Sequence, residues 1–161
     1  MTTQIDAGPP SSSEEQIAAV DLGSNSFHLI VALPRGDRLD VIDRLRDPVR
    51  LAAGLSEDKF LSNEAFDRAL ASLDKFGQRL RQIPPENVRA VGTNTLRSAR
   101  NGEAFRRRAQ TILGHRIDVI AGREEARLIY LGVAHAMPRV PGRQLVCDIG
   151  GGSTEFIIGE G

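Results

Sequence analysis

The chain has 161 residues, about the length of one domain, and its apolar fraction of 40% is enough for one packed core. Its 21 basic and 21 acidic side chains cancel, which argues against a nucleic-acid-binding protein, because such proteins carry a basic excess. A single cysteine, Cys147, excludes a disulfide framework and a zinc site of several thiolates, and it fits a reducing compartment. No apolar stretch reaches the roughly 20 residues that span a bilayer, and the N-terminal region lacks a signal-peptide core, so we expect a cytoplasmic protein.

The first part of the chain predicts a tail and three strands. Residues 1–16 carry acids, prolines and serines without an apolar pattern, and we expect them to be disordered. Apolar runs follow at 17–21 and 27–33, and a roughly alternating run follows at 39–45. Only five residues separate the first two runs, and turn residues at 34–37 close the second. This spacing predicts an antiparallel meander.

The next part of the chain alternates between helical and strand patterns. A helix is expected after Ser62, a good N-cap, because apolar residues recur every three or four positions up to Leu80. Further helices are expected at 103–113 and 124–136, and strands at 88–91, 117–120, 144–149 and 155–158, the last two as a hairpin. This order predicts an α/β domain in which helices pack on a mixed sheet with parallel crossovers. We expect Cys147 to be buried within its strand.

Two segments of the sequence echo each other: DLGSNS at residues 21–26 and DIGGGSTE at residues 148–155. Each places an acid at the end of an apolar strand, before glycine, small hydroxyl residues and a second strand. Glycines permit positive φ angles and remove side chains, so that successive backbone N–H groups can surround an anion. The acid would repel a bare phosphate, which suggests a divalent cation between the two. Ordinary hairpin turns would explain either motif alone, but two copies favour phosphate binding.

With two further segments, these motifs resemble the Ppx/GppA family of exopolyphosphatases and guanosine pentaphosphate phosphatases. The segment GTNTLRSARN (92–101) is similar to the threonine–arginine motif of the family, and IAGREEARLIYLG (120–132) is similar to its Glu-Glu-Ala helix start. The resemblance runs from about residue 17 to residue 161 and is closest to the exopolyphosphatase branch. It implies a ribonuclease-H-like fold of the actin-like ATPase superfamily.

The resemblance also implies a second ribonuclease-H-like domain beyond these 161 residues. We therefore expect residues 17–161 to be the first domain alone, which folds but does not turn over substrate, since the opposing wall of the site is missing. The full-length protein is expected to be a homodimer.

For the activity, the resemblance implies magnesium-dependent hydrolysis of the terminal phosphate of inorganic polyphosphate by a directly activated water molecule. The alternative substrate is guanosine pentaphosphate. Two other classes stay open: a non-catalytic sensor that binds alarmone nucleotides or phosphate, and an ATP-dependent kinase or ATPase of the same superfamily. The threonine–arginine and Glu-Glu-Ala motifs argue against the kinase or ATPase.

Several ionisable residues are candidates for the chemistry. Glu124 and Glu125 stand in the first turn of a predicted helix, where acids complement the helix dipole, and one of them could polarise water as general base. The resemblance points to Glu125 as that base. It also implies that Arg97 neutralises the transferring phosphoryl group and that Asp148 and Glu155 hold Mg²⁺.

The remaining candidates concern the phosphate groups of the substrate. The residues expected to bind them are Gly23, Ser24, Asn25, Ser26, Thr93, Gly150, Gly151, Gly152, Ser153 and Thr154. Asp21 is either an acid that supports the metal ligands or simply the polar residue of its turn. The three histidines, His28, His115 and His135, are too scattered to form a metal site.

Overall fold

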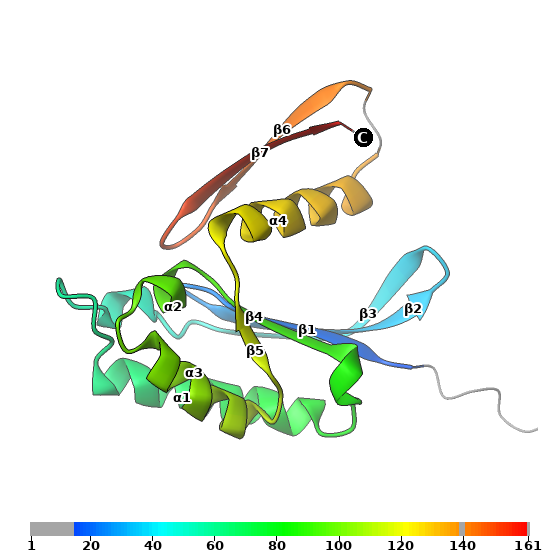
Figure 1. Ribbon diagram of the computed structural model, residues 1–161. Coiled ribbons are helices and arrows are strands. Elements are labelled where there is room, and N and C mark those ends of the chain that lie inside the picture. The colour runs from blue at the N-terminus through cyan, green and yellow to red at the C-terminus, as the bar shows by residue number, and fades with distance from the viewer. Residues whose placement is uncertain (1–14, 139–140, 161) are drawn as a thin grey trace, which may run out of the picture.

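The computed structural model describes residues 15–138 and 141–160 (Figure 1). The predicted tail at 1–16 therefore lies almost entirely outside the described residues. Its last two positions, Glu15 and Gln16, are exposed and precede the first strand.

Five strands form a mixed sheet in the order β3-β2-β1-β4-β5. The strands β1 (Ile17–Leu22), β2 (Phe27–Arg35) and β3 (Arg38–Asp47) form the predicted antiparallel meander. The strand β4 (Val88–Gly92) pairs parallel with β1, and β5 (Ile117–Val119) pairs parallel with β4. The predicted mixed sheet with parallel crossovers is confirmed.

Helices lie on both sides of this sheet (Figure 1). The helices α1 (Asn63–Leu80) and α3 (Gly102–Leu113) pack together against one face, and α4 (Gly122–Ala136) lies over the other. The hydroxyl of Ser62 accepts a hydrogen bond at the start of α1, as its N-cap position predicted. A short helix, α2 (Asn94–Ser98), follows β4. The sequence did not reveal it, since five residues are too few to show a helical period.

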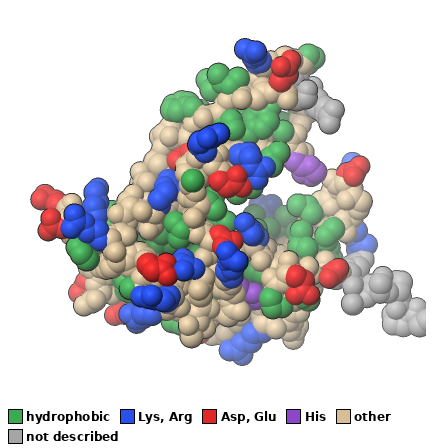
Figure 2. Space-filling model, viewed as in Figure 1, with side chains coloured by type: hydrophobic (Ala, Val, Ile, Leu, Met, Phe, Trp, Pro, Cys, Tyr) green, Lys and Arg blue, Asp and Glu red, His purple; other side chains and the backbone are tan. Residues whose placement is uncertain are grey.

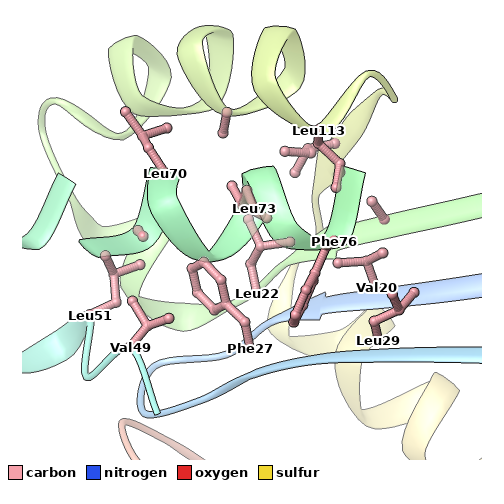
Figure 3. Packing of buried hydrophobic residues seen from close by; sticks show 14 of the residues in the cluster. Val20, Leu22, Phe27, Leu29, Val49, Leu51, Leu70, Leu73, Phe76 and Leu113 are labelled. Carbon is pink, nitrogen blue, oxygen red and sulfur yellow. The ribbon is translucent and has the colours of Figure 1, made fainter. Parts of the chain in front are cut away.

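The hydrophobic core lies between the sheet and α1 (Figure 3). Alternate residues of β1 and β2, among them Leu22, Phe27 and Leu29, point toward Leu73 and Phe76 of α1, and all are at most 1% exposed. Full burial of a side chain of this size stabilises the fold by about 1.5–3 kcal/mol. Because side chains alternate along a strand, the intervening residues of β1 and β2 face the opposite side, toward α4.

The last two strands do not join the main sheet. The strands β6 (Arg143–Ile149) and β7 (Thr154–Glu160) form a separate antiparallel hairpin that packs on α4. Close packing requires Gly159, because a Cβ atom there would lie 2.2 Å from the ring of Tyr130 on α4.

The face of the hairpin turned away from α4 is exposed. The prediction that Cys147 is buried is wrong, because this residue lies on the exposed face. Exposed large apolar side chains on the same face are Leu145, Ile149, Phe156 and Ile158. Within the part of the chain that the structure describes, no helix is long and apolar enough to cross a membrane.

Candidate active site

The two echoing motifs meet at one cleft of about 300 Å³ between the end of the main sheet and the β6–β7 turn. Figure 1 shows this turn beside α2, and Figure 2 shows the molecule hollowed between the α4–hairpin layer and the sheet. All predicted site residues except Arg97 and Thr154 line the cleft. Thr154 lies outside because it precedes Glu155 in the strand, so its side chain points to the opposite face.

The glycines of both turns are required by close packing. None of the glycines at 23 and 150–152 has a positive φ angle, so of the two properties of glycine it is the missing side chain that matters here. A Cβ atom on Gly23 would lie 2.8 Å from the carbonyl oxygen of Ser26, and one on Gly152 would lie 2.6 Å from the Ser24 hydroxyl. The absence of side chains therefore lets the first loop (residues 23–26) and the second loop (residues 150–153) touch across the cleft.

The first loop is held in place by hydrogen bonds from outside it. The backbone N–H groups of Arg50 and Ala52 donate to the carbonyl oxygens of Asn25 and Ser24, at 2.7 and 2.9 Å. The hydroxyl of Thr95, in α2, donates to the Ser24 hydroxyl at 2.7 Å. These contacts fix the loop before any ligand binds.

One hydroxyl of the first loop has no partner. The Oγ atom of Ser26 makes no hydrogen bond with any described residue, although the residue is only 6% exposed and lines the cleft. A buried polar group without a partner costs about 1–3 kcal/mol. A phosphate oxygen in the cleft would accept this hydrogen bond, so the loop fits a phosphate group.

The second loop is tied to the main sheet through α2. The side-chain amide of Asn94 donates to the carbonyl oxygen of Gly152 at 2.6 Å. Within the loop, the N–H of Gly150 donates to the carbonyl of Ser153 at 3.0 Å and closes the turn. Because Asn94 begins α2 directly after β4, this hydrogen bond fixes the width of the cleft.

Four carboxylates face the cleft: Asp21, Glu125, Asp148 and Glu155. Asp148 and Glu155 occupy directly paired positions of β6 and β7, which places both side chains on the same face. Partial burial, together with the nearby negative charge of Asp148, raises the pKa of Asp21 to about 6. Partial burial also raises the pKa of Glu125, and the negative charge of Glu155 is the second cause of this rise.

This grouping fits a divalent cation. Magnesium is held in proteins by one or two carboxylates, with water and phosphate oxygens as the other ligands. Among the described residues, no cluster of three or more His, Cys, Asp or Glu side chains has the geometry of a metal site. Asp148 and Glu155, which are directly paired across the hairpin, could supply the two carboxylates.

The structure separates the two neighbouring glutamates at the start of α4. The side chain of Glu125 lines the cleft and is 13% exposed, and its Oε2 atom lies 3.3 Å from the guanidinium of Arg97. Glu124 instead pairs with Arg127, one turn along the helix, at 2.7 Å on the solvent side. Of the two glutamates, only Glu125 can reach a ligand in the cleft.

Arg97 lies behind Glu125 and does not line the cleft. Besides its ion pair with Glu125, it donates a hydrogen bond to the carbonyl oxygen of Ile120 at 2.7 Å. In this arrangement it holds the carboxylate of Glu125. A direct contact of Arg97 with the phosphoryl group stays a prediction.

Two polar residues of the cleft, His28 and Arg46, were not predicted as site residues from the sequence. Strand alternation could have placed His28 on this face, because its neighbours Phe27 and Leu29 are apolar core residues. The place of Arg46 depends on the register between β2 and β3, which the sequence pattern left open.

The strand order β3-β2-β1-β4-β5, with helices on both sides of the sheet, defines the ribonuclease-H-like domain that the sequence resemblance implied. The model of the Ppx/GppA phosphatase family matches residues 29–161. The chain belongs to this family, as the four motifs indicated.

Individual relatives agree with this assignment. A guanosine-5'-triphosphate,3'-diphosphate pyrophosphatase of Aliivibrio fischeri is 54% identical over 144 residues, which are 89% of this chain and 29% of that protein. The enzyme of the same name from Pseudoalteromonas atlantica is 49% identical over 151 residues, which are 94% of this chain and 30% of that protein. The chain thus spans less than a third of the length of these relatives.

Solved structures show the same fold. An exopolyphosphatase from Cytophaga hutchinsonii has a TM-score of 0.84 and 36% identity, and the match covers 91% of this chain and 47% of that one. A Ppx/GppA enzyme of Aquifex aeolicus has a TM-score of 0.81 and 31% identity, and the match covers 91% of this chain and 49% of that one.

We expect Asp21→Asn to stabilise the protein in the absence of divalent cations. The folded-state pKa of about 6 lies above the ordinary value of 3.8, so ionisation of Asp21 is costlier in the folded than in the unfolded chain. The cost is absent below about pH 4, grows as the pH rises, and is complete above about pH 6.

Thermal melts should therefore show Asp21→Asn a few degrees above the wild type near pH 7.5 and equal to it near pH 3.5. Asp37→Asn, in the exposed turn between β2 and β3, is the control and should change neither melt. A stabilisation of equal size at both pH values would show that the charge of Asp21 is not the cause.

Proposed function

We propose that the full-length protein is a guanosine pentaphosphate phosphohydrolase that removes the terminal phosphate in a magnesium-dependent reaction. The observation that supports phosphoanhydride hydrolysis is the single cleft in which two phosphate loops, the unpartnered Ser26 hydroxyl and Glu125 converge. The choice of substrate rests on the curated relatives, whose names specify the guanosine compound at 54% and 49% identity. The comparisons thus favour the alternative substrate of the sequence analysis.

Inorganic polyphosphate is the second candidate substrate. It is supported by the solved structure of an exopolyphosphatase, which is 36% identical with a TM-score of 0.84. Both substrates end in a phosphoanhydride, so the same cleft chemistry serves either one. The cytoplasmic location, the homodimer and the inactivity of residues 17–161 without a second domain stay predictions.

The terminal phosphate would lie between the two loops. Ser26 would donate its free hydroxyl, and backbone N–H groups of the loops would surround the other oxygens. The hydrogen bonds that fix Ser24, Asn25 and Gly152 hold these donors in place before the substrate arrives. Such preorganised donors stabilise charge without reorganisation during the reaction.

Glu125 would accept a proton from the attacking water. The water oxygen forms a bond to the terminal phosphorus, the bond to the bridging oxygen breaks, and that oxygen leaves with the electron pair. The raised pKa of Glu125 makes it a better base than an ordinary glutamate, and Arg97 holds its carboxylate in place. Asp148 and Glu155 would hold Mg²⁺, which when bound offsets negative charge on the phosphate oxygens.

Turnover of the two substrates by the full-length protein tests the proposal. We expect a higher kcat/KM for guanosine pentaphosphate than for inorganic polyphosphate, with orthophosphate released in the presence of Mg²⁺. A preference for polyphosphate would establish the second candidate. Binding of the nucleotide without any phosphate release would instead support the sensor alternative.

Replacement of the proposed base gives a direct test of its role. Glu125→Gln keeps the shape but cannot accept the proton, so kcat should fall by roughly 10²–10⁴-fold with little change in KM. Glu124→Gln is a matched control, because it changes the same atoms one residue away and removes only a surface ion pair. It should retain nearly full activity. A larger loss of activity in Glu124→Gln than in Glu125→Gln would show that Glu125 is not the base.

Magnesium dependence tests the proposed ligands. Asp148→Asn should raise the Mg²⁺ concentration needed for half-maximal activity by at least about tenfold, because the site loses one of two carboxylates. Glu160→Gln, at the far end of β7 and outside the cleft, is the control and should leave the titration unchanged. An unchanged titration in Asp148→Asn would remove the metal assignment. A large fall in melting temperature would indicate a structural role in the turn instead.

A further inference from the structure

A row of three polar side chains crosses three adjacent strands on the floor of the cleft. Asp21 on β1 pairs with His28 on β2, and His28 pairs with Arg46 on β3. Directly opposed residues of antiparallel strands point to the same face of a sheet. All three residues line the cleft, so the row runs from the carboxylates out to the edge strand of the sheet.

Arg46 is left unpaired on this face. On the other face of β3, Asp43 pairs with Arg79 and Asp47 pairs with Lys75, both on α1. By contrast, Arg46 makes no side-chain hydrogen bond or ion pair with any described residue. The strand thus neutralises its charges on the side of α1 and presents a free cation to the cleft.

A polyanionic ligand in this cleft would need a cation to offset its charge. Among the described residues that line the cleft, Arg46 is the only lysine or arginine, against four carboxylates. Strands lie about 4.8 Å apart, which puts the backbone of Arg46 roughly 10 Å from that of Asp21, across two strand spacings. Arg46 therefore stands at the outer end of the row, on the edge strand and away from the carboxylates. A chain of further phosphates that leads from the loops toward this edge would pass it.

We propose that His28 and Arg46 form the subsite that binds the phosphate groups of the leaving part of the substrate. This rests on the proposed function, since it assumes that a phosphoanhydride is cleaved between the loops. The guanidinium of Arg46 supplies charge and a planar set of donors that matches phosphate oxygens. Partial burial and the nearby charge of Arg46 lower the pKa of His28, so its imidazole adds a neutral hydrogen-bond donor.

The kinetic signature of such a subsite differs from that of Glu125. Its contacts form when the substrate binds and persist through the reaction, so their loss weakens ground state and transition state equally. Arg46→Gln in the full-length protein should raise KM by about tenfold or more, because hydrogen bonds to charged groups contribute about 1.5–3 kcal/mol. The value of kcat should stay within about twofold, and Arg46→Lys should recover part of the affinity.

Arg44→Gln is the matched control. Arg44 lies two residues along β3 on the same face, is exposed and unpaired among the described residues, and does not line the cleft. Its loss removes the same charge from the same strand and should leave KM nearly unchanged. An equal rise of KM in both variants would show that Arg46 acts only through general electrostatic attraction, and the proposed subsite would be rejected. An unchanged KM in Arg46→Gln, or a fall of kcat alone, would also overturn it.

Binding of tripolyphosphate, measured by calorimetry with Mg²⁺, separates the subsite from the proposed function. Should the wild type bind tripolyphosphate but hydrolyse neither substrate, the proposed function fails. Weaker binding by Arg46→Gln and unchanged binding by Arg44→Gln would still establish the phosphate subsite. Equal binding by the wild type and Arg46→Gln would overturn it. Since Arg46 is exposed, both variants should melt like the wild type.

Discussion

The convergence of four carboxylates on one cleft is the constraint around which this domain is organised. Asp21, Glu125, Asp148 and Glu155 come from three separate parts of the fold, and each faces the same cavity of about 300 Å³. Burial, and after it the neighbouring carboxylates, raises the pKa values of Asp21 and Glu125. A chain selected for stability alone would separate these groups. Their convergence supports the proposed combination of a divalent cation and a phosphate ligand in the cleft.

The scaffold tolerates this grouping of carboxylates because its stability lies elsewhere. The apolar side chains of the sheet and α1 form a core on the opposite face, and residues such as Leu22 and Leu73 are fully buried there (Figure 3). The cleft face is left for polar groups. Here the loops are held by backbone hydrogen bonds and by glycines that permit van der Waals contact between Gly152 and Ser24. Core and site thus occupy different faces of the same strands.

Positive charge is distributed unevenly around the cleft. Arg97 is committed to Glu125 and to the carbonyl of Ile120, so it positions the carboxylate from behind. Arg46 has no described partner and faces the open cavity. One arginine therefore orients the proposed base, and the other is available to a ligand. The two roles could not be told apart from residue type, because both are arginines near strand ends.

The sequence by itself determined the elements and the phosphate loops. Strand and helix periods depend on neighbouring residues, and so the meander, the main helices and the hairpin were predictable. The motifs at 21–26 and 148–155 indicated phosphate binding for the same reason, since a glycine turn after a strand is a local feature.

Only the tertiary structure decided which side chains meet. It separated Glu125 from Glu124, placed Thr154 outside the cleft and Cys147 on an exposed face, and brought His28 and Arg46 into the site. These outcomes depend on register between strands and on the packing of a separate hairpin against α4. A shift of one residue in register moves a side chain to the opposite face of the sheet, and no local pattern specifies that shift.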